Sequence, residues 1–239
     1  MAESPGACLV CGEPLRYFEE AREVVCVECG RAQAAHAVCQ AGHFVCDQCH
    51  RSLGVERVMA LCAASDARDP LALAQQLMAD DAVYPNGPEH HTLVGAALLT
   101  AYRNAGGAID LDAALAELRR RSLAVPGGAC GYWGVCGAAA SAGMYCSIVL
   151  GATPLTPEPW GQTMRLTSRI LGRLADVGGP RCCKRASFTA IQEAVAHTAE
   201  LTGVQMDAPA RFTCTFMAGN AECLRTACPF FPQGPAPRA

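Results

Sequence analysis

Charged residues are scarce in this sequence and nearly balanced in sign. They make up 17% of the 239 residues, and the formal net charge is −3 at pH 7. So small a net charge gives no overall argument for a nucleic-acid or anionic-membrane partner. Because 51% of the residues are hydrophobic, the chain can bury a sizeable core, which excludes a largely disordered protein. The length allows one medium domain with a small module appended to it.

Targeting and membrane signals are also missing. The start MAESPGACLV lacks the basic residues and the apolar run of a secretory signal peptide, so we predict a cytoplasmic protein. From Ser122 to Pro157 no residue is charged, a stretch long enough to cross a bilayer. It contains Pro126 and many glycines and alanines, but neither the dense large aliphatic residues nor the aromatic belt of a spanning helix. We therefore expect a buried segment and no membrane partner.

Cysteine, in contrast, is abundant, with 16 residues. In a reducing compartment, closely spaced cysteines indicate metal ligands or reactive thiols before they indicate disulfides. Four short-spaced pairs of ligands lie in the first fifty residues, and eight such ligands fill two tetrahedral zinc sites. The predicted ligands are Cys8, Cys11, Cys26, Cys29, Cys39, His43, Cys46 and Cys49. A segment this short cannot bury eight such groups without a metal or another staple.

The stretch CQAGHFVCDQC resembles the second half of RING-type and related treble-clef fingers. The resemblance implies interleaved pairs, with one zinc bound by Cys8, Cys11, Cys39 and His43 and the other by Cys26, Cys29, Cys46 and Cys49. The spacer before His43 is one residue longer than in most RING fingers, so His36 or His50 is an alternative ligand. A zinc ribbon made by the first four cysteines is the alternative pairing. Closed four-ligand sites leave no position for a substrate, so this module is expected to be structural or to dock a protein partner.

Beyond residue 51 the hydrophobic pattern is helical. After the helix-starting Asp69-Pro70, helices are predicted at about 89–104, 110–121, 136–151, 160–176, 183–202 and 220–226. The best strand signal is Arg211–Phe216. We predict a mainly α fold, with a two-zinc treble-clef module at 1–51, a compact helical domain at 52–231 and a disordered tail at 232–239.

The motif GPRCCKR contains two adjacent thiols, Cys182 and Cys183. Gly179-Pro180 ends one helix and the next apolar pattern begins soon after, so both thiols should lie at a helix N-terminus beside cationic residues. That location lowers thiol pKa values and favours thiolates, which bind metals and act as nucleophiles. Two inert packed thiols are the alternative.

Three other motifs have residues suited to chemistry. NGPEHH begins a helix with His90 and His91, where adjacent histidines bind metal or shuttle protons, although a simple capped helix start is the alternative. Cys130 and Cys136 lie among glycines that allow close backbone approach to a cluster or substrate, or that simply form a turn. The spacing of the third group is more typical of iron–sulfur than of zinc ligation; this group is Cys214, Cys223 and Cys228-Pro229.

Together, NGPEHH, CGYWGVCGA, GPRCCKR and the final Cys-Pro resemble a prokaryotic family, domain of unknown function 5714, over nearly the whole chain. Some members join this region to a methyltransferase domain, so the resemblance implies methyl or sulfur chemistry. Arginines at 165, 169 and 173 and at 119–121 indicate an anionic small molecule or RNA as a partner, or else solvated helix faces.

We therefore predict one convergent site in the helical domain. It would use Cys182 or Cys183 as the reactive thiol and His90 or His91 as a proton donor or further ligand. The predicted cofactor ligands are Cys130, Cys136, Cys182, Cys183, Cys214, Cys223 and Cys228. The site would hold an Fe–S cluster or reactive thiols for redox, sulfur-transfer or methyl-transfer chemistry. The alternatives are a non-enzymatic zinc-stabilised adaptor and a zinc hydrolase, for which the HExxH helix is missing.

Overall fold

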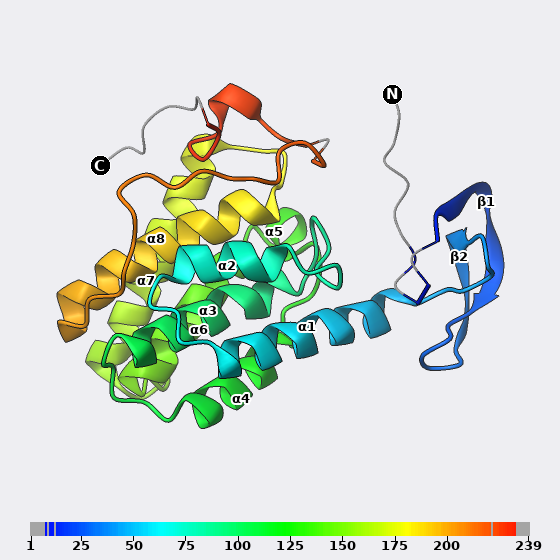
Figure 1. The fold of residues 1–239 in the computed structure, drawn as a ribbon. Coiled ribbons are helices and arrows are strands. Elements are labelled where there is room, and N and C mark those ends of the chain that lie inside the picture. The colour runs from blue at the N-terminus through cyan, green and yellow to red at the C-terminus, as the bar shows by residue number, and fades with distance from the viewer. Residues whose placement is uncertain (1–7, 9, 12, 221, 233–239) are drawn as a thin grey trace.

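The computed structural model of the protein describes residues 8, 10–11, 13–220 and 222–232. A β-hairpin comes first and a mainly helical domain follows it (Figure 1), which confirms the predicted fold class. The elements are β1 (Leu15–Val25), β2 (Ala32–Cys39), α1 (Asp47–Ala64), α2 (Pro70–Met78), α3 (His90–Asn104), α4 (Leu111–Ser122), α5 (Ala129–Tyr132), α6 (Gly137–Leu150), α7 (Pro157–Val177), α8 (Cys183–Thr202) and the 3-10 helix η1 (Arg225–Ala227). Of the predicted disordered tail, 233–239 lies outside the described residues.

The hairpin pairs β1 with β2 in antiparallel register, from Leu15 opposite Cys39 to Val25 opposite Ala32. The register shifts between Tyr17 and Arg22, which marks a bulge. Most of its side chains are exposed or half-buried, and a two-stranded ribbon of this kind is marginal in water without further support. The predicted metal ligands flank both ends of the ribbon, where they can supply that support.

Helix α3 is the centre of the helical domain. Every residue from His90 to Tyr102 is buried, because α3 packs against α1, α2, α4, α6 and α8. A helix that is buried all round must be largely uncharged, as this one is. Gly95 permits close packing of α4 and α6 on α3, since a Cβ there would overlap the side chains of Leu118 and Ser141. In the described part of the chain, no helix is both long and apolar enough to cross a membrane.

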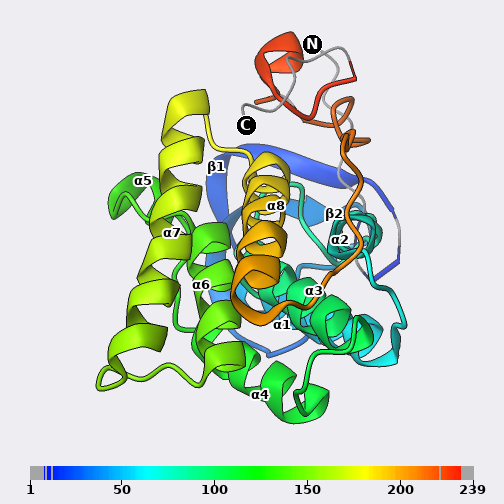
Figure 2. The same cartoon turned by 90° about the vertical axis from the view of Figure 1, so that its left-hand side faces the viewer.

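The helix boundaries follow local chemistry. The Asp69 carboxylate accepts hydrogen bonds from the Leu71 and Ala72 amides and Pro70 occupies the first turn, so α2 begins as predicted. Asp110 caps α4 in the same way through the Ala113 amide. Helix α1 is continuous across residue 51, where the boundary between the two predicted units falls. The chain after α8 returns along that helix to its N-terminal end, where η1 lies (Figures 1 and 2).

The strand signal at Arg211–Phe216 does not correspond to a strand. This segment has no regular structure, and the Cys214 amide donates to the Phe230 carbonyl at 2.8 Å in place of a strand ladder. The alternation of apolar residues there reflects packing against the helical core, because Phe212 lies against Phe188 with ring centroids 4.7 Å apart.

Candidate functional site

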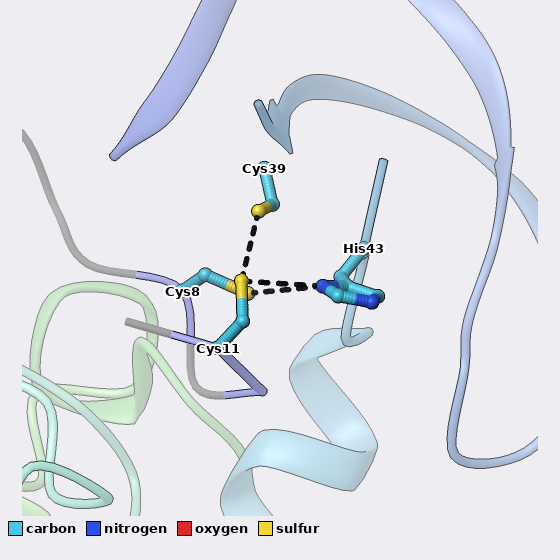
Figure 3. A group of neighbouring side chains, drawn as sticks. All are labelled: Cys8, Cys11, Cys39 and His43. Atoms are coloured by element: carbon cyan, nitrogen blue, oxygen red, sulfur yellow. Dashed lines mark hydrogen bonds between the residues drawn. The ribbon is translucent and has the colours of Figure 1, made fainter. Parts of the chain in front are cut away.

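The first group of potential metal ligands joins the chain before β1 to the turn after β2. The ligand atoms of Cys8, Cys11, Cys39 and His43 all lie within 4.8 Å of one another. Figure 3 shows the three thiols and the imidazole converging on one point. The Cys11 sulfur is 3.4 Å from the Cys39 sulfur and 3.3 Å from His43 Nδ1. Three thiols and one imidazole make a donor set suited to a tetrahedral metal ion, above all zinc.

The second group joins the hairpin turn to the start of α1. Cys26, Cys29, Cys46 and Cys49 also place their sulfurs within 4.8 Å of one another. Burial by itself raises the pKa of the Cys26 thiol, but amide hydrogen bonds, led by that from Cys46, outweigh it and lower the pKa to about 6. A thiolate stabilised by amides is the form that binds a metal.

The grouping is the interleaved one that the RING-like resemblance implies. His43 is the histidine of the first group, and the two alternative histidines lie elsewhere. The His36 ring faces the Phe18 carbonyl, with Nδ1 at 3.2 Å, and the His50 ring stacks on Tyr84 with centroids 3.3 Å apart. The first four cysteines do not form one group, so the geometry does not support the zinc-ribbon pairing.

Cys182 and Cys183 face different surroundings although they are adjacent in the chain. Cys182 is the N-cap of α8, and its sulfur accepts hydrogen bonds from the Arg185 amide at 3.5 Å and from Asn220 Nδ2 at 3.4 Å. It lines a small cavity of ≈ 20 Å³ together with Cys214, Cys223 and Cys228. We call this cavity, which these four cysteines line, the four-cysteine cavity.

Amide hydrogen bonds to sulfur recur around the four-cysteine cavity. The Phe216 amide donates to the Cys214 sulfur and the Arg225 amide to the Cys223 sulfur, each at 3.4 Å. The Cys228 sulfur bonds with the Phe230 backbone in the same two-residue pattern. In the first ligand group, the Cys8 sulfur accepts a hydrogen bond from the Val10 amide at 3.4 Å, and the Cys39 sulfur accepts one from the Ala41 amide at 3.3 Å. The C-terminal loop therefore repeats the local geometry of the N-terminal ligands.

Cys183 lies in a buried environment next to Cys136. Its amide donates to Asn86 Oδ1 at 3.0 Å, and its thiol bonds with the Gly87 backbone. Burial raises the pKa of the Cys183 thiol to about 12 and also raises the pKa of Cys136. The prediction that Cys183 is partly ionised at neutral pH is therefore wrong, because desolvation outweighs the helix N-terminus and the nearby cations. Cys130 is exposed.

His90 and His91 begin α3 as buried, neutral rings. His90 Nδ1 lies 3.1 Å from the Gly87 carbonyl, which only accepts, so Nδ1 carries the proton and Nε2 accepts from Lys184 Nζ at 3.2 Å. Burial, and then the Lys184 charge, lower the pKa of His90 well below its ordinary value. His91 Nδ1 donates to the Val125 carbonyl at 3.3 Å, and burial lowers its pKa too. Neither ring lines the four-cysteine cavity.

The predicted convergent site thus divides into two parts. Cys182 and the three C-terminal cysteines line one cavity, while Cys183 lies near Cys136, and neither of these two nor the His90 ring lines that cavity. Residue patterns gave no indication of Asn220 as a hydrogen-bond donor to sulfur. Arg185, one of the cationic residues of GPRCCKR, lines the four-cysteine cavity and is buried.

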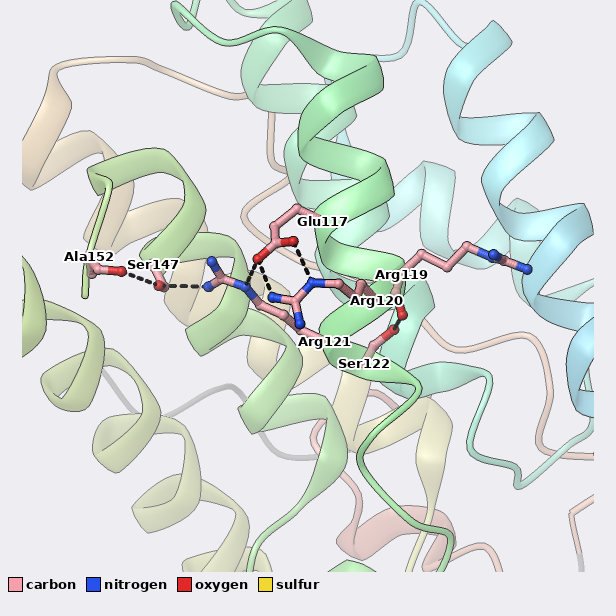
Figure 4. Close-up of polar contacts among 7 residues, drawn as sticks. All are labelled: Glu117, Arg119, Arg120, Arg121, Ser122, Ser147 and Ala152. Atoms are coloured by element: carbon pink, nitrogen blue, oxygen red, sulfur yellow. Dashed lines mark hydrogen bonds and ion pairs between the residues drawn. The ribbon is translucent and has the colours of Figure 1, made fainter. Parts of the chain in front are cut away.

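The arginine groups are largely neutralised. Arg120 and Arg121 each donate to Glu117 at 2.7 Å, and Arg121 also reaches Ser147 of α6 (Figure 4). The hydrogen bonds of these two arginines lower the pKa of Glu117 to about 2. On α7, Arg169 pairs with Glu200 at 3.5 Å and Arg173 pairs with Glu193. Ion-paired helix faces explain most of the basic pattern.

The fold and the cysteine groups define a cysteine-rich helical protein with two N-terminal groups able to hold metal ions. The model of the family of unknown function DUF5714 matches residues 58–231, so the chain belongs to that family. The match begins within α1 and includes the four-cysteine cavity, but not the hairpin. No curated protein and no solved structure matches the chain.

Proposed function

We propose that this protein is a cytoplasmic metalloprotein with two structural zinc ions in the hairpin module and one iron–sulfur cluster in the helical domain. The cluster would be held by Cys182, Cys214, Cys223 and Cys228. The observation that carries the proposal is that four cysteines from two distant segments line one cavity, each with an amide donor on its sulfur. Four thiolates are the usual ligands of such clusters, and hydrogen bonds to sulfur tune their potentials.

A buried cation supports the same assignment. Arg185 is 6% exposed and lines the cavity, and its Nε has no hydrogen-bond partner within the described residues. Its Nη2 donates to the Gly178 and Pro180 carbonyls, both at 2.8 Å, and these bonds fix the side chain in place. A buried donor without a partner is costly. An anionic cluster with sulfide acceptors would supply that partner.

The spacing of the sulfurs favours a cluster over a single ion. Among the described residues, no three of these four side chains place their ligand atoms within 4.8 Å of one another, whereas both N-terminal groups do. A cluster offers a separate iron to each thiolate, so its ligands stand further apart than those of one zinc ion. The remaining wall is apolar, with Met217, Leu224, Phe230 and Phe231, and such a wall limits access of water to a redox centre.

An iron–sulfur cluster supplies one-electron redox chemistry or a sulfur-rich surface for transfer reactions when it is bound. The residues of the chain would act on it through charge and hydrogen bonds. Arg185 would balance negative charge, and Asn220 would hold the Cys182 sulfur in position. We propose redox or sulfur-transfer chemistry on this basis, with methyl transfer as the neighbouring possibility that the family resemblance implies.

The adjacent cysteines provide a matched test. The Cys182→Ser and Cys183→Ser variants would be purified without oxygen, reconstituted with iron and sulfide, and compared with the wild type by metal analysis and visible spectroscopy. We expect the wild type and Cys183→Ser to hold iron, sulfide and a charge-transfer band, and Cys182→Ser to lose them. Zinc content should be equal in all three. Wild-type protein without iron, or equal iron in both variants, would refute the cluster assignment.

A protein-interaction role for the hairpin is the second candidate. Tyr17, Val25 and Val27 are large apolar residues of this module with exposures of 57%, 57% and 47%. Exposed apolar side chains on a small metal-stapled module suit docking of another protein. The Tyr17→Ser/Val25→Ser variant tests this role: it should keep its zinc but lose proteins that co-purify with the wild type. If the same proteins co-purify with both, the hairpin is not the docking surface.

A further inference from the structure

A second cavity lies beside the four-cysteine cavity. It measures ≈ 280 Å³ and is lined by residues from the end of α2, the segment after it, the start of α8 and residues 215–220. The residues that matter in its wall are Met78, Val83, Pro85, Lys184, Phe216 and Asn220. The volume is near the lower end of small-molecule sites, which span roughly 300–1,000 Å³. Asn220 also donates to the Cys182 sulfur, so one side chain connects the two cavities.

Lys184 is the only charged residue among the described residues that line this second cavity. It is only 3% exposed. Its ammonium donates to the Tyr84 carbonyl at 3.3 Å and to His90 Nε2 at 3.2 Å, and it lies 4.9 Å from the centroid of the Phe216 ring. These bonds use two of its three N–H groups. One N–H therefore remains for a ligand in the cavity.

The charge of Lys184 has no close counter-ion. Within the described part of the chain, no carboxylate lies within ion-pair distance of its Nζ, although Glu89 acts on it from further away. A buried cation without an anionic partner is destabilising, and an anion in the cavity would compensate it.

We propose that this cavity binds a small molecule that carries one carboxylate, with the carboxylate at Lys184 and an apolar body against Met78, Val83 and Phe216. A single ammonium with one remaining N–H suits a monoanion, whereas a phosphate dianion needs several donors. The apolar wall suits a hydrocarbon or aromatic body of a few carbons. The inference rests on the proposed function in one respect: a ligand here would lie one side chain from Cys182 and would be the molecule on which the cluster acts.

Hexanoate and its neutral isostere hexanamide are suitable probes. Isothermal titration on the zinc-loaded full-length protein should give a dissociation constant for hexanoate at least about tenfold lower than that for hexanamide. In Lys184→Met, which keeps the length of the side chain, the two ligands should bind equally. Equal binding of both ligands to the wild type, no binding of either, or preference for hexanoate that survives in Lys184→Met would overturn the proposal.

A second variant keeps the test valid if Lys184→Met does not fold. Gly219 lines the cavity and has open space where a Cβ would lie, so Gly219→Leu should fill the cavity and weaken hexanoate binding by about tenfold or more. Gly161 of α7 is also open but lies outside the cavity wall, so Gly161→Leu is the matched control and should bind as the wild type does. Unchanged hexanoate binding in Gly219→Leu would refute the site.

The Cys228→Ser variant separates this proposal from the cluster. It removes a proposed cluster ligand whose sulfur bonds with the Phe230 backbone and which does not line the second cavity, and hexanoate binding should persist in it. Loss of iron in this variant concerns only the proposed function. Loss of hexanoate binding with Lys184 intact would show that the cavity is not an independent anion site.

Discussion

The ring of His91 lies directly against Gly137, the first residue of α6. A Cβ on Gly137 would overlap the Cδ2 and Nε2 atoms of that ring, far inside van der Waals contact. The ring cannot move away freely, because His91 Nδ1 donates to the Val125 carbonyl at 3.3 Å. Glycine at 137 is therefore required by the packing of α6 on α3.

We predict that Gly137→Ala destabilises the protein by about 1–3 kcal/mol, the usual cost of overpacking a core. On helix propensity alone the same substitution would be neutral or favourable, so the overlap decides the sign. Gly172 of α7 is the control, since it is exposed and has no atom within 4 Å of its Cβ position. Gly172→Ala should stabilise by about 0.5–1 kcal/mol in urea unfolding. Equal effects of both substitutions would contradict the packing argument.

Double substitutions test the interleaved metal ligands. Cys8 and Cys39 belong to one group and Cys8 and Cys26 to different groups. Cys8→Ser/Cys39→Ser should therefore lose one zinc ion, and Cys8→Ser/Cys26→Ser should lose both. Sequential pairing would give the opposite result for the two variants. Zinc per protein, measured by mass spectrometry after dialysis, distinguishes the two arrangements.

Removal of zinc should unfold the hairpin module before the helical domain. The hairpin strands bury few of their side chains, whereas the helical domain has a continuous hydrophobic core around α3. Amide hydrogen exchange with and without a chelator should show loss of protection in β1 and β2, while α3 and α6 remain protected. Full protection of β1 and β2 after zinc has left would show that the hairpin folds without metal.

Acid should destabilise the protein partly through His91. Burial lowers its pKa below the ordinary 6.5, so the unfolded chain takes up a proton more readily than the folded protein as the pH falls. Its contribution to stability is complete above pH 6.5 and is lost as the pH falls toward the folded pKa. In wild type, the free energy of unfolding should drop by about 1 kcal/mol more than in His91→Gln between about pH 7 and pH 5.

His36 of β2 provides the control for this pH effect. It is exposed, so His36→Gln should follow the wild-type pH dependence. Acid release of zinc affects all three proteins alike and cancels in the comparison. Parallel pH curves for wild type and His91→Gln would remove His91 as a source of the acid sensitivity.

Much of the fold could be predicted from local signals. The Asp69-Pro70 start of α2 and the range of α8 follow from capping residues and apolar spacing, which act over a few residues. The eight N-terminal ligands could be identified because short spacers restrict where a pair can point, whereas their interleaved grouping was implied only by the resemblance to RING-type fingers. The hairpin strands could not be predicted, since β1 is mostly polar and exposed and the metal ligands that could support it lie at its ends.

The helical-domain site was harder to predict because adjacency in sequence does not fix direction at a helix start. Cys182 is the N-cap and Cys183 the first helical residue, so the backbone turns between them and their side chains diverge. Local charge suggested an ionised Cys183, but the degree of burial depends on α3 and α6 and is a tertiary property. The partnership of Cys182 with Asn220 likewise spans 38 residues and depends on the return of the C-terminal chain.

The first turn of α1 connects the second group of potential metal ligands to the helical domain. Cys46 and Cys49 begin this helix, the next residue, His50, stacks on Tyr84, and Arg51 donates to the Ser122, Leu123 and Val125 carbonyls at 3.2–3.3 Å. Tyr84 in turn gives its carbonyl to Lys184. Two contacts therefore connect the second ligand group to the helical domain: His50 packs on Tyr84, and Arg51 holds the chain at the end of α4. A metal ion bound by Cys46 and Cys49 would fix the start of α1, and with it both of these contacts.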